Sequence, residues 1–417
     1  MTADRAAAVA LDEADPLRRF RERFVITDDD LVYLDGNSLG RLPIATRRRL
    51  RRLIEREWGG DLIRGWDSWI GLAREAGDML ATGVLEAEPG EVVVADSTSV
   101  NLFKLAAAAL DARPDRTVIL TDDDNVPTDQ YVLAGLAAAR GLRLRLVKSD
   151  LDGGVPAEAV EAALGPDTAL VSLSHVAYRS GAIADMHRIT RAAHDAGALV
   201  LWDLSHSAGS VPVPLRSAGV DLAVGCTYKH LNAGPGAPAF LYVRAGLQGG
   251  LRQPIWGWFG QRDQFAMDST YDPVDGIERF LVGTPGVLGL TAVLEGARLS
   301  AEAGIDAIAA KARSLTSYAV ELVDGWLAPL GFDLASPRDP DRRGAHIALH
   351  HARAWQVVQA LKDANVIPDF RTPDRIRLGF APLYTRHVDV YEGLARLHAI
   401  VTAGTHLGYP EARTRVT

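Results

Sequence analysis

Two side chains that could take part in catalysis, an aspartate and a lysine, each follow a short apolar run. Asp203 ends the run 199–203, and Lys229 comes shortly after the run 222–224. The glycines and proline of 234–236 favour a turn after Lys229, so we expect this lysine to be presented from a loop. A lysine amine can bind an aldehyde as a Schiff base, and a carboxylate can keep a pyridine nitrogen protonated. Pyridoxal 5'-phosphate (PLP) enzymes need this pair. An isolated loop lysine is weak evidence, because most lysines are exposed and structural.

A run of hydroxyl side chains supplies a candidate phosphate site. Ser97, Thr98 and Ser99 precede an apolar stretch, 102–110, that we expect to be helical. Hydroxyls and free N–H groups at a helix N-terminus bind anions through hydrogen bonds and the helix dipole. A simple Ser/Thr helix cap would give the same pattern. Together with Lys229 and Asp203, the run favours a phosphorylated cofactor.

The elements that must position these residues alternate in type from about residue 90 to 245. Helical stretches such as 127–140 and 186–196 separate short apolar runs, which predict strands at 117–120, 142–147, 169–173, 199–202, 222–224 and 239–243. This alternation is typical of an α/β fold with a mainly parallel sheet and helices on both faces. Ligands bind at the carboxyl ends of such strands, where Ser174, Asp203 and Lys229 stand.

The chain after residue 300 has a different pattern. Long helical periods at 301–329, 353–364 and 387–403 accompany short strand candidates near 345–350 and 375–380. We expect a smaller α+β domain there. The predicted division is an N-terminal segment (1–45) joining the small domain, a large cofactor-binding domain (46–295) and the small domain itself (296–417).

Composition narrows the class of protein. The 417 residues, of which 47% are hydrophobic and 24% charged, suit two packed domains. A net charge of -8 argues against binding nucleic acid or an anionic membrane. The basic run 47–52 predicts an amphipathic helix whose charged face is solvated or faces a dimer partner. A single cysteine, Cys226, and no continuous apolar N-terminal stretch predict a cytoplasmic protein without a membrane span. No metal site is expected.

Nine segments in collinear order resemble the kynureninase family of fold-type I, class V aminotransferase-like PLP enzymes. They are YLDGNSLG (33–40), STSVNL (97–102), PTDQY (127–131), SHVAYRSG (174–181), WDLSHSAG (202–209), YKHLNAGPGAPAFLYV (228–243), GWFG (257–260), RFLVGTP (279–285) and RLGFAPLY (377–384). The resemblance spans nearly the whole chain and is of the bacterial type. It implies a seven-stranded, mainly parallel sheet and a homodimer with its active site at the subunit interface.

The resemblance also implies roles for individual residues. Lys229 would hold PLP and move the substrate proton, Asp203 would pair with the pyridine nitrogen, and Arg377 would bind the substrate carboxylate. Tyr228 would either transfer a proton at Cβ or donate a hydrogen bond to the phosphate. The other implied cofactor contacts are Thr98, Ser99, Val126, Asp129, Ser174 and His206, with Trp258 and Thr284 reaching the cofactor of the neighbouring subunit. The other implied substrate contacts are Asn37, Ser38, Trp66 and Tyr178.

The implied reaction is hydrolysis of L-kynurenine to anthranilate and L-alanine in tryptophan catabolism. The bacterial form of the family favours unsubstituted kynurenine, and hydrolysis of 3-hydroxykynurenine to 3-hydroxyanthranilate stays open. The pathway context, including NAD synthesis, stays open. One residue departs from the family pattern: Val126 stands where a phenylalanine usually stacks on the cofactor ring. Within the fold, a cysteine desulfurase is disfavoured because Cys226 is expected to be buried and inert. An aminotransferase or a lyase acting on another amino acid, and a non-catalytic PLP-fold protein, remain alternatives.

Overall fold

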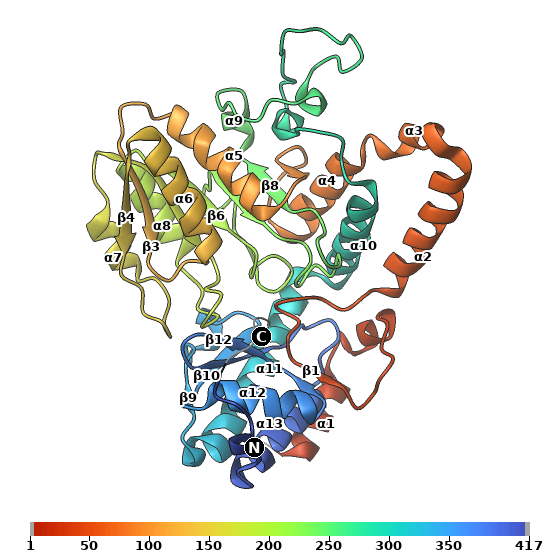
Figure 1. Cartoon of the computed structure of the whole chain (residues 1–417), viewed down its shortest axis with the longest axis vertical. Helices are drawn as coiled ribbons and strands as arrows, with labels where there is room; N and C mark the ends of the chain where they lie inside the picture. The colour runs from red at the N-terminus through yellow and green to blue at the C-terminus, as the bar shows by residue number, and fades with distance from the viewer. Residues whose placement is uncertain (1–3, 413–417) are drawn as a thin grey trace.

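A seven-stranded sheet forms the centre of the larger of two lobes (Figure 1). In the computed structural model, which describes residues 4–412, the strand order is β2-β8-β7-β6-β5-β3-β4. Only β8 of this sheet runs antiparallel to its neighbours. The predicted α/β fold with a mainly parallel seven-stranded sheet is therefore confirmed. The strands are β2 (Val92–Val94), β3 (Val118–Asp122), β4 (Arg143–Val147), β5 (Thr168–Ser174), β6 (Leu199–Asp203), β7 (Leu222–Gly225) and β8 (Phe240–Val243).

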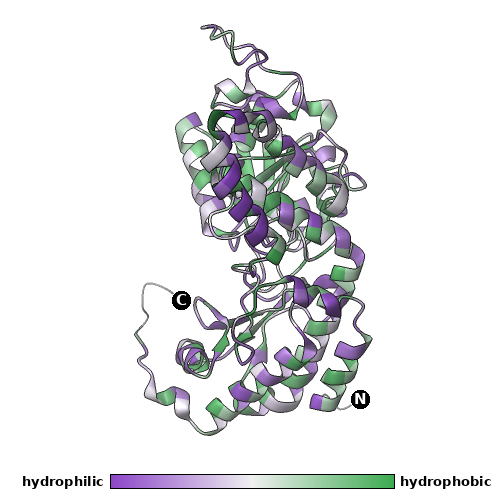
Figure 2. Ribbon diagram, turned by 90° about the vertical axis from the view of Figure 1, so that its right-hand side faces the viewer, coloured by the Kyte–Doolittle hydropathy of each residue, from purple (hydrophilic) through white to green (hydrophobic). Residues whose placement is uncertain are grey.

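Burial on both faces explains why these strands are continuous apolar runs. Every residue of β2, β3, β6, β7 and β8 is buried, whereas β4 at the sheet edge has two exposed and two half-buried residues. Figure 2 shows the hydrophobic strands of this lobe enclosed by helices of mixed polarity. The flanking helices are α4 (Leu72–Val84), α5 (Thr98–Asp111), α6 (Pro127–Arg140), α7 (Ala157–Ala163), α8 (Met186–Asp195) and α10 (Val287–Ala303).

The smaller lobe is built on an antiparallel sheet of order β12-β13-β10-β9, with its own apolar core. Its strands are β9 (Asp333–Leu334), β10 (His346–His350), β12 (Asp369–Arg371) and β13 (Arg375–Gly379), and its main helices are α11 (Ile305–Leu322), α12 (Ala354–Asp363) and α13 (His387–Thr402). The N-terminal segment joins this lobe, because β1 (Val32–Tyr33) pairs in parallel with β11 (Val366–Ile367) and α1 (Arg5–Ala14) contacts α13.

Two segments of the larger lobe project from its body (Figure 1). The helix α2 (Ile44–Arg52) carries the basic run and continues into a π-helical segment, Leu53–Asp61. The second projection includes residues 261–276 and leaves Phe265 and Met267 71% and 75% exposed. Within residues 4–412, no helix has the length and apolar character needed to cross a membrane.

Candidate active site

The site begins where three neighbouring parallel strands end. Ser174 is the last residue of β5, Asp203 the last of β6, and Lys229 follows β7 in the next loop. Because adjacent parallel strands end at the same edge of a sheet, these three residues come together as the sequence predicts. Asp203 is buried, and its Oδ1 accepts a hydrogen bond of 2.8 Å from the Ser205 N–H.

A cavity of about 570 Å³ lies between the two lobes at this edge. Lys229 Nζ sits in its wall, 2.8 Å from Nε2 of His206. Burial, and then the nearby Lys229 and Arg377 cations, lower the pKa of His206 well below its ordinary value, so its ring is neutral and Nε2 can accept a hydrogen bond from Lys229. The lining residues are Ser38, Val126, Pro127, Tyr178, His206, Tyr228, Lys229, Trp355, Phe370, Arg371, Thr372 and Arg377.

A second carboxyl group accompanies Asp203. Asp129, in the first turn of α6, is 2% exposed, and its Oδ2 has no hydrogen-bond partner. Burial, followed by the adjacent Asp203 carboxylate, raises the pKa of Asp129 well above its ordinary value. Two buried carboxyl groups with an unpartnered oxygen suit a protonated ring nitrogen, which would supply both a positive charge and an N–H donor.

The predicted phosphate site lies at the start of α5. Ser97 caps this helix and accepts a hydrogen bond from the Val100 N–H at 3.4 Å, while Thr98 and Ser99 form its half-buried first turn. The first-turn N–H groups of a 14-residue helix carry partial positive charge suited to a phosphate. A lysine, a carboxyl pair and this helix start therefore fit the aldehyde, ring nitrogen and phosphate of PLP.

A polar chain holds Val126 at the cavity wall. The Ser174 hydroxyl donates to Oδ1 of Asn125 at 2.7 Å, and the same oxygen accepts the Val126 N–H at 2.8 Å. The Pro127 ring begins α6 directly after Val126, which fixes where the helix starts. Asn125 was not identified from the sequence, although its place after the end of β3 is the signal that marked Ser174 and Asp203.

Arg377 lies in β13, and its side chain is only 1% exposed. Its Nη1 donates to the Tyr178 carbonyl oxygen and its Nη2 to the Ser38 hydroxyl, each at 2.7 Å. An ion pair of 2.6 Å joins Nη2 to Asp369. Burial lowers the pKa of Arg377 to about 10, so the guanidinium stays charged at neutral pH. A fixed, charged fork in the cavity wall can bind a carboxylate.

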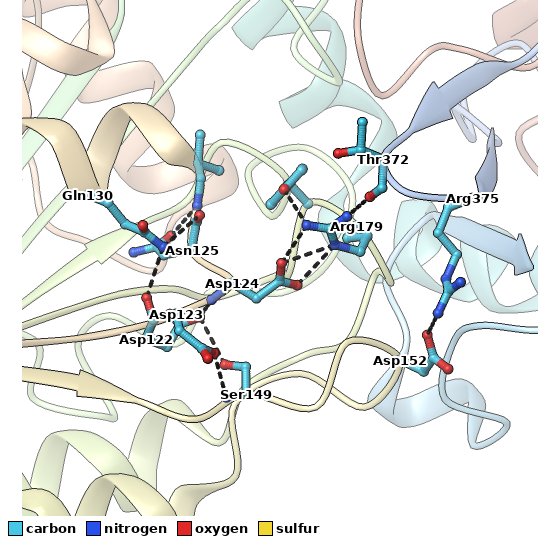
Figure 3. Close-up of polar contacts among 12 residues, drawn as sticks. Asp122, Asp123, Asp124, Asn125, Gln130, Ser149, Asp152, Arg179, Thr372 and Arg375 are labelled. Carbon is cyan, nitrogen blue, oxygen red and sulfur yellow. Dashed lines mark hydrogen bonds and ion pairs between the residues drawn. The ribbon is translucent and has the colours of Figure 1, made fainter. Parts of the chain in front are cut away.

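Arg179 connects the two lobes beside the cavity (Figure 3). Its guanidinium forms a two-point ion pair with Asp124 and donates to the backbone carbonyl of Thr372 in the smaller lobe. A second link joins Arg375 Nη2 to Oδ1 of Asp152 at 2.7 Å. These contacts hold the segment that follows β12 against the cofactor side of the cavity. This connection could not be predicted from the sequence, because its partners are more than 190 positions apart.

Four predicted site residues lie neither in the cavity wall nor at the strand ends and helix start described above. Asn37 is fully buried, and Trp66 packs against Trp69 and Phe259. Trp258 is 41% exposed and Thr284 is also exposed. Neither Asn37 nor Trp66 lines the cavity within this chain. Exposure of Trp258 and Thr284 is what a contact with a neighbouring chain requires.

Comparison with known proteins gives consistent results for sequence and fold. A family model described as "Kynureninase C-terminal domain" matches residues 308–397. Curated relatives named "Kynureninase" from Pseudomonas fluorescens and from Burkholderia pseudomallei (strain 1106a) are 42% and 43% identical over 405 residues, covering 95% of this chain and 95% of each relative.

Solved structures of more distant proteins share the fold. An apo cysteine desulfurase from Thermococcus onnurineus NA1 has a TM-score of 0.80 at 20% identity, covering 92% of this chain and 98% of that one. A C-DES mutant with glycine covalently linked to its PLP cofactor has a TM-score of 0.78 at 19% identity, covering 91% and 98%. At this level of identity the likeness concerns the fold.

Proposed function

The chain belongs to the kynureninase family, and from this premise we propose that it hydrolyses L-kynurenine to anthranilate and L-alanine with PLP as cofactor. The observation that carries the proposal is the identity of 42–43% over 95% of both chains. The cavity between the lobes supports it, because it brings a lysine, a carboxyl pair and a carboxylate-binding arginine to one place.

We propose the following contacts for the cofactor. Lys229 would bind the aldehyde, Asp203 and Asp129 would face the ring nitrogen, and Thr98 and Ser99 would bind the phosphate. His206, Ser174, Val126 and Tyr228 would complete the cofactor contacts. When bound, PLP supplies an electron sink for the carbanion that forms during bond cleavage.

The protein's own groups bind the substrate and move its protons. The Arg377 guanidinium binds the α-carboxylate, with Ser38 and the Tyr178 carbonyl fixing its orientation. The Lys229 amine takes the proton from the substrate Cα. Burial raises the pKa of Tyr228, so its phenol stays protonated and can give a proton to Cβ. The alternative role of Tyr228, a hydrogen bond to the phosphate, uses the same protonated form.

The chemistry of the fold neighbours does not transfer to this chain. Cysteine desulfurase chemistry needs a reactive thiol, whereas Cys226 is 3% exposed and its Sγ lies 3.6 Å from the Ser205 carbonyl oxygen. Burial raises the pKa of this thiol, which disfavours the thiolate. An aminotransferase remains the second candidate, because it would use the same lysine, aspartate and arginine; it would yield a keto acid and no anthranilate.

We also propose a homodimer in which the partner completes the cavity. Trp258 and Thr284 would reach the partner's cofactor, and Trp66, which packs against Phe259 next to Trp258, would line the aromatic part of that site. Asn37 would support Ser38 from behind. We also propose a cytoplasmic location and a division into domains after residues 45 and 295. The pairing of β1 with β11 supports the joining of the N-terminal segment to the small domain.

The test is release of anthranilate from L-kynurenine, followed by its fluorescence, with 3-hydroxykynurenine assayed in parallel. The absorption spectrum of the purified protein is recorded first, because a lysine-bound cofactor absorbs in the visible or near-ultraviolet. A protein that shows this band and releases no anthranilate would refute the hydrolase assignment while leaving the cofactor assignment intact. Formation of a keto acid in its place would establish the aminotransferase.

A further inference from the structure

A row of charged side chains faces the cavity from the smaller lobe. In the antiparallel pairing of β12 with β13, Asp369 stands opposite Arg377 and Arg371 stands opposite Arg375. Since side chains of a strand alternate between its faces, these four side chains share one face of the sheet. Arg371 and Arg377 both line the cavity. Arg371 was not among the residues predicted from the sequence.

The three arginines of this row differ in how many carboxylates they pair with. Arg375 pairs with Asp152 at 2.7 Å and also with Asp374. Arg377 pairs with Asp369 at 2.6 Å, and Asp35 lies 3.9 Å from its Nη2. Within residues 4–412, the carboxylate paired with Arg371 is the same Asp369, at 3.0 Å. One carboxylate therefore serves two guanidinium groups in the cavity wall.

One donor on each of these two guanidinium groups lacks a partner among the residues that the structure describes. Nε of Arg371 and Nε of Arg377 are buried atoms without a hydrogen-bond partner in the described part of the chain. A buried N–H of a charged group is costly to leave unpaired. The Arg371 side chain is 32% exposed, against 1% for Arg377, so Arg371 is the more accessible of the two. A second carboxylate entering the cavity would contact the exposed part of Arg371 and balance the charge that Asp369 alone leaves over on these two groups.

We propose that Arg371 is a substrate-binding residue that, together with Arg377, holds the α-carboxylate of the amino acid substrate. The inference rests on the proposed function for the identity of that substrate. Each carboxylate oxygen would accept from one guanidinium, and Asp369 would keep both groups oriented as a shared counter-ion. The backbone next to Arg371 is already fixed, because Arg179 donates to the Thr372 carbonyl.

The experiment compares two probes that differ only in the carboxylate. L-alanine and L-alaninamide are titrated into the PLP-loaded protein, and their dissociation constants are read from the change in visible absorbance. In Arg371→Gln we expect L-alanine to bind at least tenfold more weakly and L-alaninamide to change by less than threefold. Arg377→Gln serves as the positive comparison. Arg375→Gln is the matched control, because it removes the same charge from the same sheet face at a side chain that does not line the cavity.

The ratio of the two dissociation constants decides the outcome. An unchanged ratio in Arg371→Gln, or equal weakening of both probes, overturns the inference, and so does an equal change of ratio in Arg375→Gln. If Arg371→Gln purifies without the visible band, Arg371→Lys is measured in its place, because it keeps the charge but loses the planar fork. A change of at least threefold in the ratio then supports the inference, and an unchanged ratio overturns it. The anthranilate assay on the unmodified protein tests the proposed function separately.

Discussion

Replacing Arg179 by methionine should destabilise the protein through the partner left behind. The side chains of Arg179 and Asp124 are 11% and 10% exposed, so the ion pair is largely removed from water. Removing one member of a buried pair costs about 3–5 kcal/mol, because the remaining charge is buried without compensation. The small residual exposure of the pair lowers this cost, whereas the loss of the hydrogen bond to Thr372 raises it. We therefore expect the free energy of unfolding to fall by about 3 kcal/mol.

The loss of stability in Arg179→Met should be larger at neutral than at acidic pH. Burial raises the pKa of Asp124, while Arg179 acts to lower it. In Arg179→Met the carboxyl group stays buried without the arginine, so the pKa of Asp124 should rise further. A carboxyl group whose folded-state pKa lies above its unfolded value destabilises the fold at higher pH, and this penalty is relieved as the pH falls through the folded-state pKa. The difference from the unmodified protein should therefore be larger at pH 7.5 than at pH 5.

Urea unfolding followed by tryptophan fluorescence measures this difference at both values of pH. Arg338→Met is the control, because the pair of Arg338 with Asp324 is 65% and 46% exposed and such pairs contribute about 0–1 kcal/mol. The double variant Asp124→Asn/Arg179→Met should recover most of the lost stability, since it also removes the buried charge. Equal effects of Arg179→Met and Arg338→Met, or no recovery in the double variant, would refute the reasoning.

Three further predictions concern the cavity and its surroundings. Lys229→Ala should lose the visible band of the bound cofactor and at least about 100-fold of the anthranilate release, since it removes the group that transfers the Cα proton; a retained band would place the linkage elsewhere. Val126→Phe should tighten PLP binding by roughly two- to tenfold, the equivalent of about 0.5–1.5 kcal/mol of aromatic stacking, as measured by cofactor titration of the apo protein; weaker binding would mean that the cavity wall has no room for a ring. Cys226→Ser should keep anthranilate release within about threefold, because the thiol is buried and does not itself line the cavity, and a serine hydroxyl can replace its hydrogen bond with Tyr228; complete loss in a folded variant would show that the thiol itself is needed.

The large sheet could be predicted from the sequence because most of its strands are buried on both faces. Apolar runs such as 199–203 mark β6 directly, and the polar residue that ends each run marks the site. The strand β2, Val92–Val94, is too short for any period, and nothing local shows that β8 runs antiparallel. Direction and pairing depend on contacts between distant segments, which a single sequence does not reveal.

The candidate site was predictable where a strand end or a segment resembling a known family singles out a residue. Asp203 and Lys229 follow predicted strands, and Arg377 stands in the segment 377–384 that resembles the kynureninase family. The structure places Lys229 and Arg377 in one cavity beside the strand end that carries Asp203. Arg371 and Arg179 could not be found in this way, because an arginine near a turn is ordinarily a solvated surface residue. Their significance comes from strand register and from contacts across the two lobes.

The burial of Cys226 has a practical consequence. Because this is the one cysteine of the chain and its thiol is 3% exposed with a raised pKa, the folded protein should react very slowly with maleimide reagents. A cysteine introduced on the surface of each lobe would then be labelled without background. Paired fluorophores at such positions would report the separation of the two lobes in solution, and its change when an amino acid fills the space between them.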